Sequence, residues 1–134
     1  MIATPQERWE RAQRQIDGGW YAALIHAGLL LVLLGLNFSA RTLSRAAGIQ
    51  GGIEVLLLLL LALGVARRGR LSALGLVLAG GLWTLSAWAV AHSIVWSLVG
   101  CGYTACYIRG LIGVSAYHEV MAEQLAAGTP LWRP

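Results

Sequence analysis

The sequence predicts an all-α integral membrane protein, a four-helix bundle with a short amphipathic N-terminal interfacial helix. Of 134 residues, 57% are hydrophobic and only 12% are charged, whereas soluble domains carry about 25% charged residues. The apolar residues form four nearly uncharged runs, each close to the length that a helix needs to cross a bilayer. This composition excludes an ordinary soluble enzyme, a disordered chain and a nucleic-acid binder. We therefore expect the lipid bilayer, and no nucleic acid, as a partner.

The first element is a helix over residues 4–17 that we expect to lie along the lipid headgroups. Thr4 and Glu7 have the spacing of a capping box, and Pro5 suits the first helical position. One stripe of the helix is largely apolar and is formed by Trp9, Ala12, Ile16 and Trp20. The sequence Asp17-Gly18-Gly19 predicts a break before the chain enters the membrane.

Four membrane spans are expected to follow, over residues 20–38, 48–66, 71–91 and 94–116, with a tail over 117–134. Arginines separate the first three spans, and Gly48, Gly51 and Gly52 open the second. Only His92 and Ser93 mark the last boundary, but a single helix through both runs would far exceed a bilayer. A tight hairpin near His92 is therefore predicted.

The orientation follows from the arginines, which supply all ten basic residues. Four spans place the N-terminal segment, the connection at 67–70 and the tail on one side, and these carry most of the arginines. The positive-inside rule then puts both termini in the cytoplasm. We expect a multi-pass protein of the bacterial inner membrane.

Polar residues within the spans are functional candidates because they are costly in lipid. The four candidates for a ligand or ion path are Glu54, His92, Arg109 and His26. Glu54 lies near the outer end of its span, where it is either a coupling site or an interfacial carboxylate bonded to the nearby glycine turn. Small multidrug transporters also have four spans and one membrane-embedded Glu, but theirs is on the first span.

His26 and Arg109 each have a structural and a functional interpretation. His26 either bonds a helix carbonyl or ligates a haem or metal, for which His118 is the better mate in depth. No metal and no cofactor is predicted. Arg109 either extends towards the headgroups, pairs with Asp17 or Glu119, or binds an anionic headgroup or ligand.

Small residues at intervals of about four predict a close helix contact. On the fourth span they are Gly102, Cys106, Gly110 and Gly113, and on the third Gly75 and Ala79. We expect these faces to pack the third and fourth spans together, or to form a contact with another copy or another membrane protein.

The fourth span ends in Arg109-Gly110, a second glycine at Gly113, and Ala116-Tyr117-His118. This ending resembles that of small uncharacterised four-span bacterial membrane proteins. The resemblance implies an architecture and no activity.

No catalytic residue is predicted, because the sequence has no phosphate loop, no nucleophile near a base and no paired carboxylates on one helix face. The sequence favours a non-catalytic protein that contacts a membrane partner, as an accessory subunit, an assembly factor or an immunity-type protein. A small oligomeric transporter or channel using Glu54 and Arg109 is the alternative. A membrane enzyme that binds a cofactor or lipid is the third hypothesis.

Overall fold

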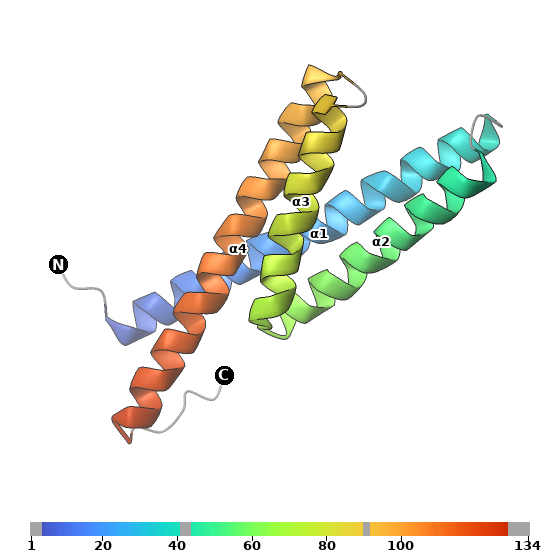
Figure 1. Cartoon of the computed structure of the whole chain (residues 1–134). Helices are drawn as coiled ribbons and strands as arrows, with labels where there is room; N and C mark the ends of the chain where they lie inside the picture. The colour runs from blue at the N-terminus through green and yellow to red at the C-terminus, as the bar shows by residue number, and fades with distance from the viewer. Residues whose placement is uncertain (1–3, 41–43, 90–91, 129–134) are drawn as a thin grey trace.

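The computed structural model describes residues 4–40, 44–89 and 92–128, and these form four α-helices (Figure 1). They are α1 (Pro5–Ser39), α2 (Arg45–Ala66), α3 (Arg70–Ala89) and α4 (Ile94–Ala126). All four are long and apolar enough to cross a membrane. The expected all-α four-helix bundle is confirmed, and the chain is a multi-pass membrane protein.

Side chains at three helix starts bond backbone amides that the helix leaves unpaired. The Thr4 hydroxyl accepts from the Glu7 amide and the Glu7 carboxylate accepts from the Thr4 amide, which is the expected capping box. Ser44 caps α2 and Ser93 caps α4 in the same way. The hairpin near His92 is also confirmed, since α3 ends at Ala89 and α4 begins at Ile94.

The expected break at Asp17-Gly18-Gly19 is wrong, because α1 runs through it without interruption. The segments 4–17 and 20–38 are therefore one helix. A glycine in a helix costs about 1 kcal/mol relative to alanine, but Gly19 is where α1 touches α4. A Cβ atom on Gly19 would lie 2.9 Å from the Gly110 Cα. Tertiary packing thus requires the residue that local propensity disfavours.

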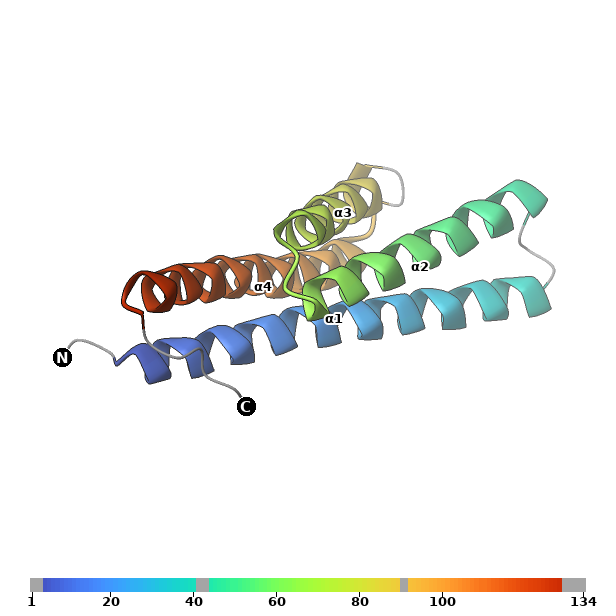
Figure 2. The same cartoon turned by 90° about the horizontal axis from the view of Figure 1, so that it is seen from below.

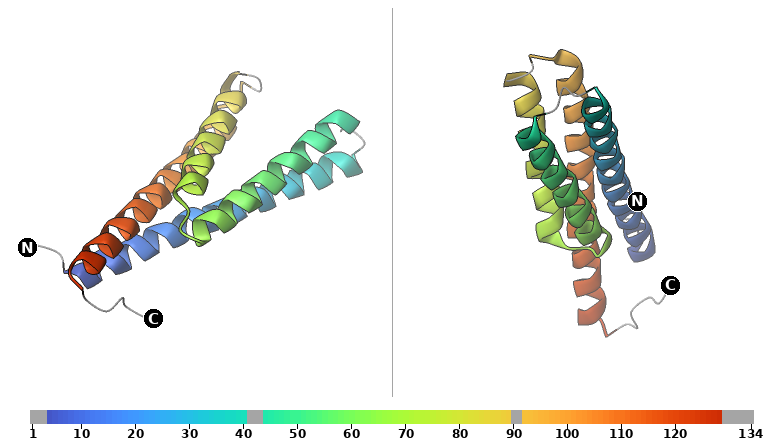
Figure 3. Two further views of the ribbon diagram at one scale, coloured as in Figure 1. Left: turned by 60° about the horizontal axis from the view of Figure 1, so that its bottom comes forward. Right: turned by 90° about the vertical axis from the view of Figure 1, so that its right-hand side faces the viewer.

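The helices form two antiparallel hairpins, α1–α2 and α3–α4, that diverge towards their connections (Figures 1 and 3). Figure 2 shows α1 lying alongside both α2 and α4. The long helices α1 and α4 extend beyond the α2–α3 turn. There the Arg8 guanidinium binds the Glu123 carboxylate at 2.6 Å, so the N-terminal end of α1 and the C-terminal end of α4 meet at one end of the bundle. The tail residues up to Ala126 continue α4, and 129–134 lie outside the described residues.

Large apolar side chains cover the outside of the bundle, including Leu36, Ile53, Leu71, Leu82 and Leu98. The interior is built largely from alanine, glycine and a few larger side chains. A soluble bundle would place its leucines inside, so this inverted distribution fits a protein surrounded by lipid.

The small residues of α4 pack within the chain, but mostly not where the sequence predicted. Gly110 and Gly113 face α1, and Gly75 of α3 faces Leu61 of α2. The expected packing of α3 against α4 is present, and it uses Gly80 beside Tyr107 and Gly100 beside Trp83. The exposed Gly102 has open space around it, and Cys106 is also exposed.

Candidate functional site

A cavity of about 410 Å³ lies where the two hairpins diverge, and we call it the cleft. Residues of α1, α2 and α3 line it: His26, Leu30, Gln50, Glu54, Leu57, Leu58, Ala79, Leu82, Trp83 and Ser86. Four leucines, one alanine and one tryptophan form its apolar wall, and the other four lining residues are polar. A volume of about 300–1,000 Å³ and an apolar wall with few polar groups are typical of small-molecule sites.

Glu54 supplies the carboxylate of the cleft. It is half-buried, and Gln50 donates a hydrogen bond to it from Nε2 at 3.2 Å. The sequence placed Glu54 near the outer end of a span that starts at Gly48. The helix begins earlier, at Arg45, so Glu54 is the tenth of its 22 residues and lies near its midpoint. The acid is therefore deeper in the apolar helix than we expected.

His26 supplies the second polar group and is only 1% exposed. Its Nδ1 atom lies 2.8 Å from the Tyr107 hydroxyl, and the Tyr103 ring stacks on it with centroids 4.4 Å apart. Trp83 meets the imidazole edge-on at 4.9 Å. The other nitrogen, Nε2, is buried and has no hydrogen-bond partner among the described residues.

Buried polar atoms are nearly always hydrogen-bonded, and an unpaired one costs about 1–3 kcal/mol. The unpaired Nε2 atom belongs to a ring that lines the cleft. A water molecule or the polar group of a solute in the cleft would satisfy it. The cleft is thus lined by a carboxylate that can hold a positive charge and by an imidazole ring with one unpaired nitrogen.

The other two candidates for a ligand or ion path, His92 and Arg109, do not line the cleft. His92 is exposed in the α3–α4 connection, where its φ is +47°. Arg109 is exposed on α4 and forms no ion pair with Asp17 or Glu119. The structure therefore brings Glu54 and His26 to one cavity and leaves His92 and Arg109 outside it.

No metal or haem geometry joins the histidines in the part of the chain that the structure describes. His118, the proposed mate of His26, instead bonds the Arg68 carbonyl oxygen through Nε2 at 3.0 Å. No group of three or more His, Cys, Asp and Glu residues there could hold a metal ion.

Sequence reasoning missed the aromatic partners of His26. Tyr103 and Tyr107 are four residues apart and so share one face of α4. That spacing is a visible signal, but it does not say which helix the face meets. Gln50 is one helical turn before Glu54 and could have been proposed as its hydrogen-bond donor.

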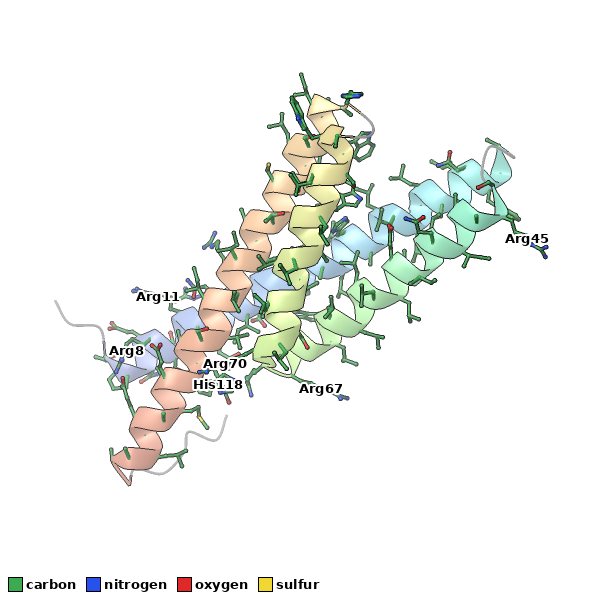
Figure 4. The ribbon with its side chains drawn as sticks, viewed as in Figure 1. Arg8, Arg11, Arg45, Arg67, Arg70 and His118 are labelled. Carbon is green, nitrogen blue, oxygen red and sulfur yellow. The ribbon has the colours of Figure 1, made fainter. Side chains whose placement is uncertain are left out.

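Basic and aromatic side chains gather at the end of the bundle where α1 begins and α4 ends. Figure 4 shows Arg8, Arg11, Arg67, Arg70 and His118 around this end and Arg45 at the other. The Arg68 guanidinium lies 4.5 Å from the Tyr117 ring centroid and 5.8 Å from that of Trp9. These contacts tie the α2–α3 turn to α1 and α4.

Comparison with known proteins gives no match: no family model, no curated protein and no solved structure matches this chain.

Proposed function

We propose that this protein is a small membrane transporter that binds a lipophilic organic cation in the cleft. The observation that carries the proposal is that Glu54, near the midpoint of an apolar helix, lines the same cavity as the ring of His26. The Nε2 atom of that ring is buried and has no hydrogen-bond partner among the described residues. Acidic residues within membrane helices are costly and usually mark a substrate or ion path.

The chemistry of the walls defines the substrate class. A carboxylate attracts a positive charge, and Trp83 adds an aromatic ring to which a cation is attracted. The leucines around them suit an apolar body.

The orientation predicted from the arginines belongs to this proposal. Basic side chains concentrate at the end that holds the α2–α3 turn (Figure 4), which supports placing that end and both termini in the cytoplasm of a bacterial cell. The cleft then opens towards the opposite side of the inner membrane.

The hypothesis that the protein contacts a membrane partner through the small residues of α4 has less support from the way these residues pack. Gly110 and Gly113 already face α1, so they are not available to a partner helix. Gly102 and Cys106 are the exposed members of that set, and a membrane partner at these positions stays a prediction.

The test uses two probes of one shape and opposite charge, tetraphenylphosphonium and tetraphenylborate. Binding to the purified full chain is measured by equilibrium dialysis, followed by uptake into proteoliposomes. We expect the phosphonium to bind the wild type, and Glu54→Gln to weaken it at least about tenfold because the counter-charge is lost. Glu119→Gln is the matched control, because this exposed acid does not line the cleft.

Equal binding of the two ions, or an unchanged phosphonium affinity in Glu54→Gln, would contradict the charge-selective site. Binding of the phosphonium without uptake would mean that the protein is a receptor and not a transporter, and would overturn the proposal of transport.

A further inference from the structure

A second cavity lies on another face of the molecule, along the line where α1 meets α4. Its volume is about 140 Å³, and it is lined by Arg14, Gln15, Gly18, Cys106 and Arg109. We call it the arginine seat. It shares no lining residue with the cleft. Its position follows from the close contact of Gly19 with Gly110, which brings the two arginine-bearing helices together.

Both arginines of the seat lack a protein counter-ion among the described residues. The ion pair found among the described residues joins Arg8 to Glu123, away from the seat, and neither Arg14 nor Arg109 takes part in one. Arg109 is the only charged residue between Arg70 and Glu119 in the sequence, so its guanidinium belongs to an otherwise uncharged stretch. A guanidinium without a counter-ion in an apolar stretch of a membrane helix needs water or an anion.

The seat is open at the surface of the bundle. Arg14, Gly18, Cys106 and Arg109 are all exposed. A Cβ atom on Gly18 would meet nothing within 4 Å, so there is room for a larger side chain at this position of the lining. Guanidinium groups bind phosphate oxygens with two parallel hydrogen bonds, and Gln15 adds an amide donor.

We propose that the arginine seat binds the phosphate of an anionic phospholipid headgroup, with Arg14 and Arg109 on either side of it. The headgroup enters from the leaflet at the end of the bundle where α1 begins and α4 ends, and its acyl chains lie along the apolar surfaces of α1 and α4. The negative charge replaces the counter-ion that the protein does not supply to Arg109.

The test measures lipid binding to the full chain in detergent by native mass spectrometry. The ligands are phosphatidylglycerol, the zwitterionic phosphatidylcholine and inorganic phosphate. We expect one phosphatidylglycerol to bind preferentially, and Arg14→Gln with Arg109→Gln to weaken it about tenfold or more. Arg11→Gln is the charge control, because Arg11 is an exposed arginine of the same helix that does not line the seat.

A pair of glycine variants separates binding from folding. Gly18→Leu adds a bulky side chain to the lining of the seat without meeting a neighbouring atom at its Cβ, so it should weaken lipid binding without lowering the unfolding temperature. Gly28→Leu is the matched control on α1, because Gly28 also has open space and lies away from the seat.

Wild-type lipid affinity in both the double arginine variant and Gly18→Leu would overturn the proposal. Equal binding of phosphatidylcholine and phosphatidylglycerol would overturn the preference for an anionic headgroup. Binding of inorganic phosphate that excludes the lipid would assign the seat to a free anion. None of these outcomes depends on Glu54 or on binding in the cleft.

Discussion

The Tyr107 hydroxyl and His26 Nδ1 lie 2.8 Å apart and join α4 to α1 inside the bundle. Tyr107 is 1% exposed, so neither group has water as an alternative partner. The contact fixes the ring of His26 where α1 borders the cleft. Part of the wall of the candidate site is thereby positioned from a helix that does not line it.

Replacing Tyr107 with Phe removes this hydrogen bond and keeps the ring. We expect the free energy of unfolding to fall by about 1 kcal/mol, because hydrogen bonds between membrane helices have modest net value and His26 Nδ1 loses its partner. Thermal unfolding in detergent measures the change. Tyr103→Phe is the control, since the Tyr103 hydroxyl makes no hydrogen bond within the described residues while its ring stacks on His26. Equal loss in both variants would mean that the Tyr107–His26 bond has no special role.

The glycine contact between α1 and α4 gives a second prediction. A Cβ atom on Gly110 would lie 3.1 Å from the Gly19 Cα, so Gly110→Leu forces the helices apart. We expect a loss of about 1–3 kcal/mol, the range for overpacked interiors. The same substitution at Gly102 meets open space and removes a glycine from the interior of a helix, so it should not lower stability.

The Gly102 variant also tests the hypothesis of a membrane partner. A stable Gly102→Leu protein that loses its biological activity would support a helix contact at this exposed position. Retained activity would leave Gly102 without a role in function. Activity is compared in cells that lack the wild-type gene, after expression and unfolding temperature have been matched.

The sequence predicted the four helices because length, hydropathy and flanking arginines are local properties. It also predicted the Thr4 capping box, which depends on two residues three apart. The continuity of α1 through Gly18-Gly19 was not predictable in this way, because Gly110, the α4 residue that Gly19 meets, lies more than ninety residues further along the chain. Local propensity favours a break in α1 at these glycines, but the close approach of Gly110 to Gly19 accompanies a continuous helix.

The candidate site was predictable only as separate residues. Glu54 and His26 were identified because each is a polar residue in an apolar run. Their meeting at one cavity depends on how the two hairpins diverge, and no local pattern encodes that geometry. The same limit applies to Arg109, whose neighbour Arg14 lies on a helix far away in the sequence.

Arg68 combines an unusual backbone conformation with an aromatic contact. Its φ is +62°, in the left-handed region, while its side chain lies over Tyr117. Asn tolerates this conformation, so Arg68→Asn removes the cation–π contact without adding backbone strain. We expect a loss of about 0.5–1 kcal/mol in thermal unfolding. Arg67→Asn, one residue earlier, should be nearly neutral, and equal losses at both positions would contradict a specific role for the Tyr117 contact.

The Arg8–Glu123 ion pair predicts a pH dependence at the end of the bundle. The hydrogen bond from Arg8, together with its charge, lowers the pKa of the Glu123 carboxyl below its ordinary value. A lowered pKa means that the pair stabilises the fold above the unfolded pKa of about 4.3. That contribution is lost as the pH falls through the lower folded value, and it is small because both side chains are exposed.

Carbon-13 NMR titration of the Glu123 carboxyl in detergent directly checks the direction of this pKa shift. Arg8→Gln should move the Glu123 pKa upwards, because the donor and its charge are removed. Arg11→Gln should leave it where it is, since Arg11 does not contact Glu123. A Glu123 titration that is unaffected by Arg8→Gln would show that these ends of α1 and α4 are not joined in solution. The long helices α1 and α4 would then extend independently beyond the α2–α3 turn.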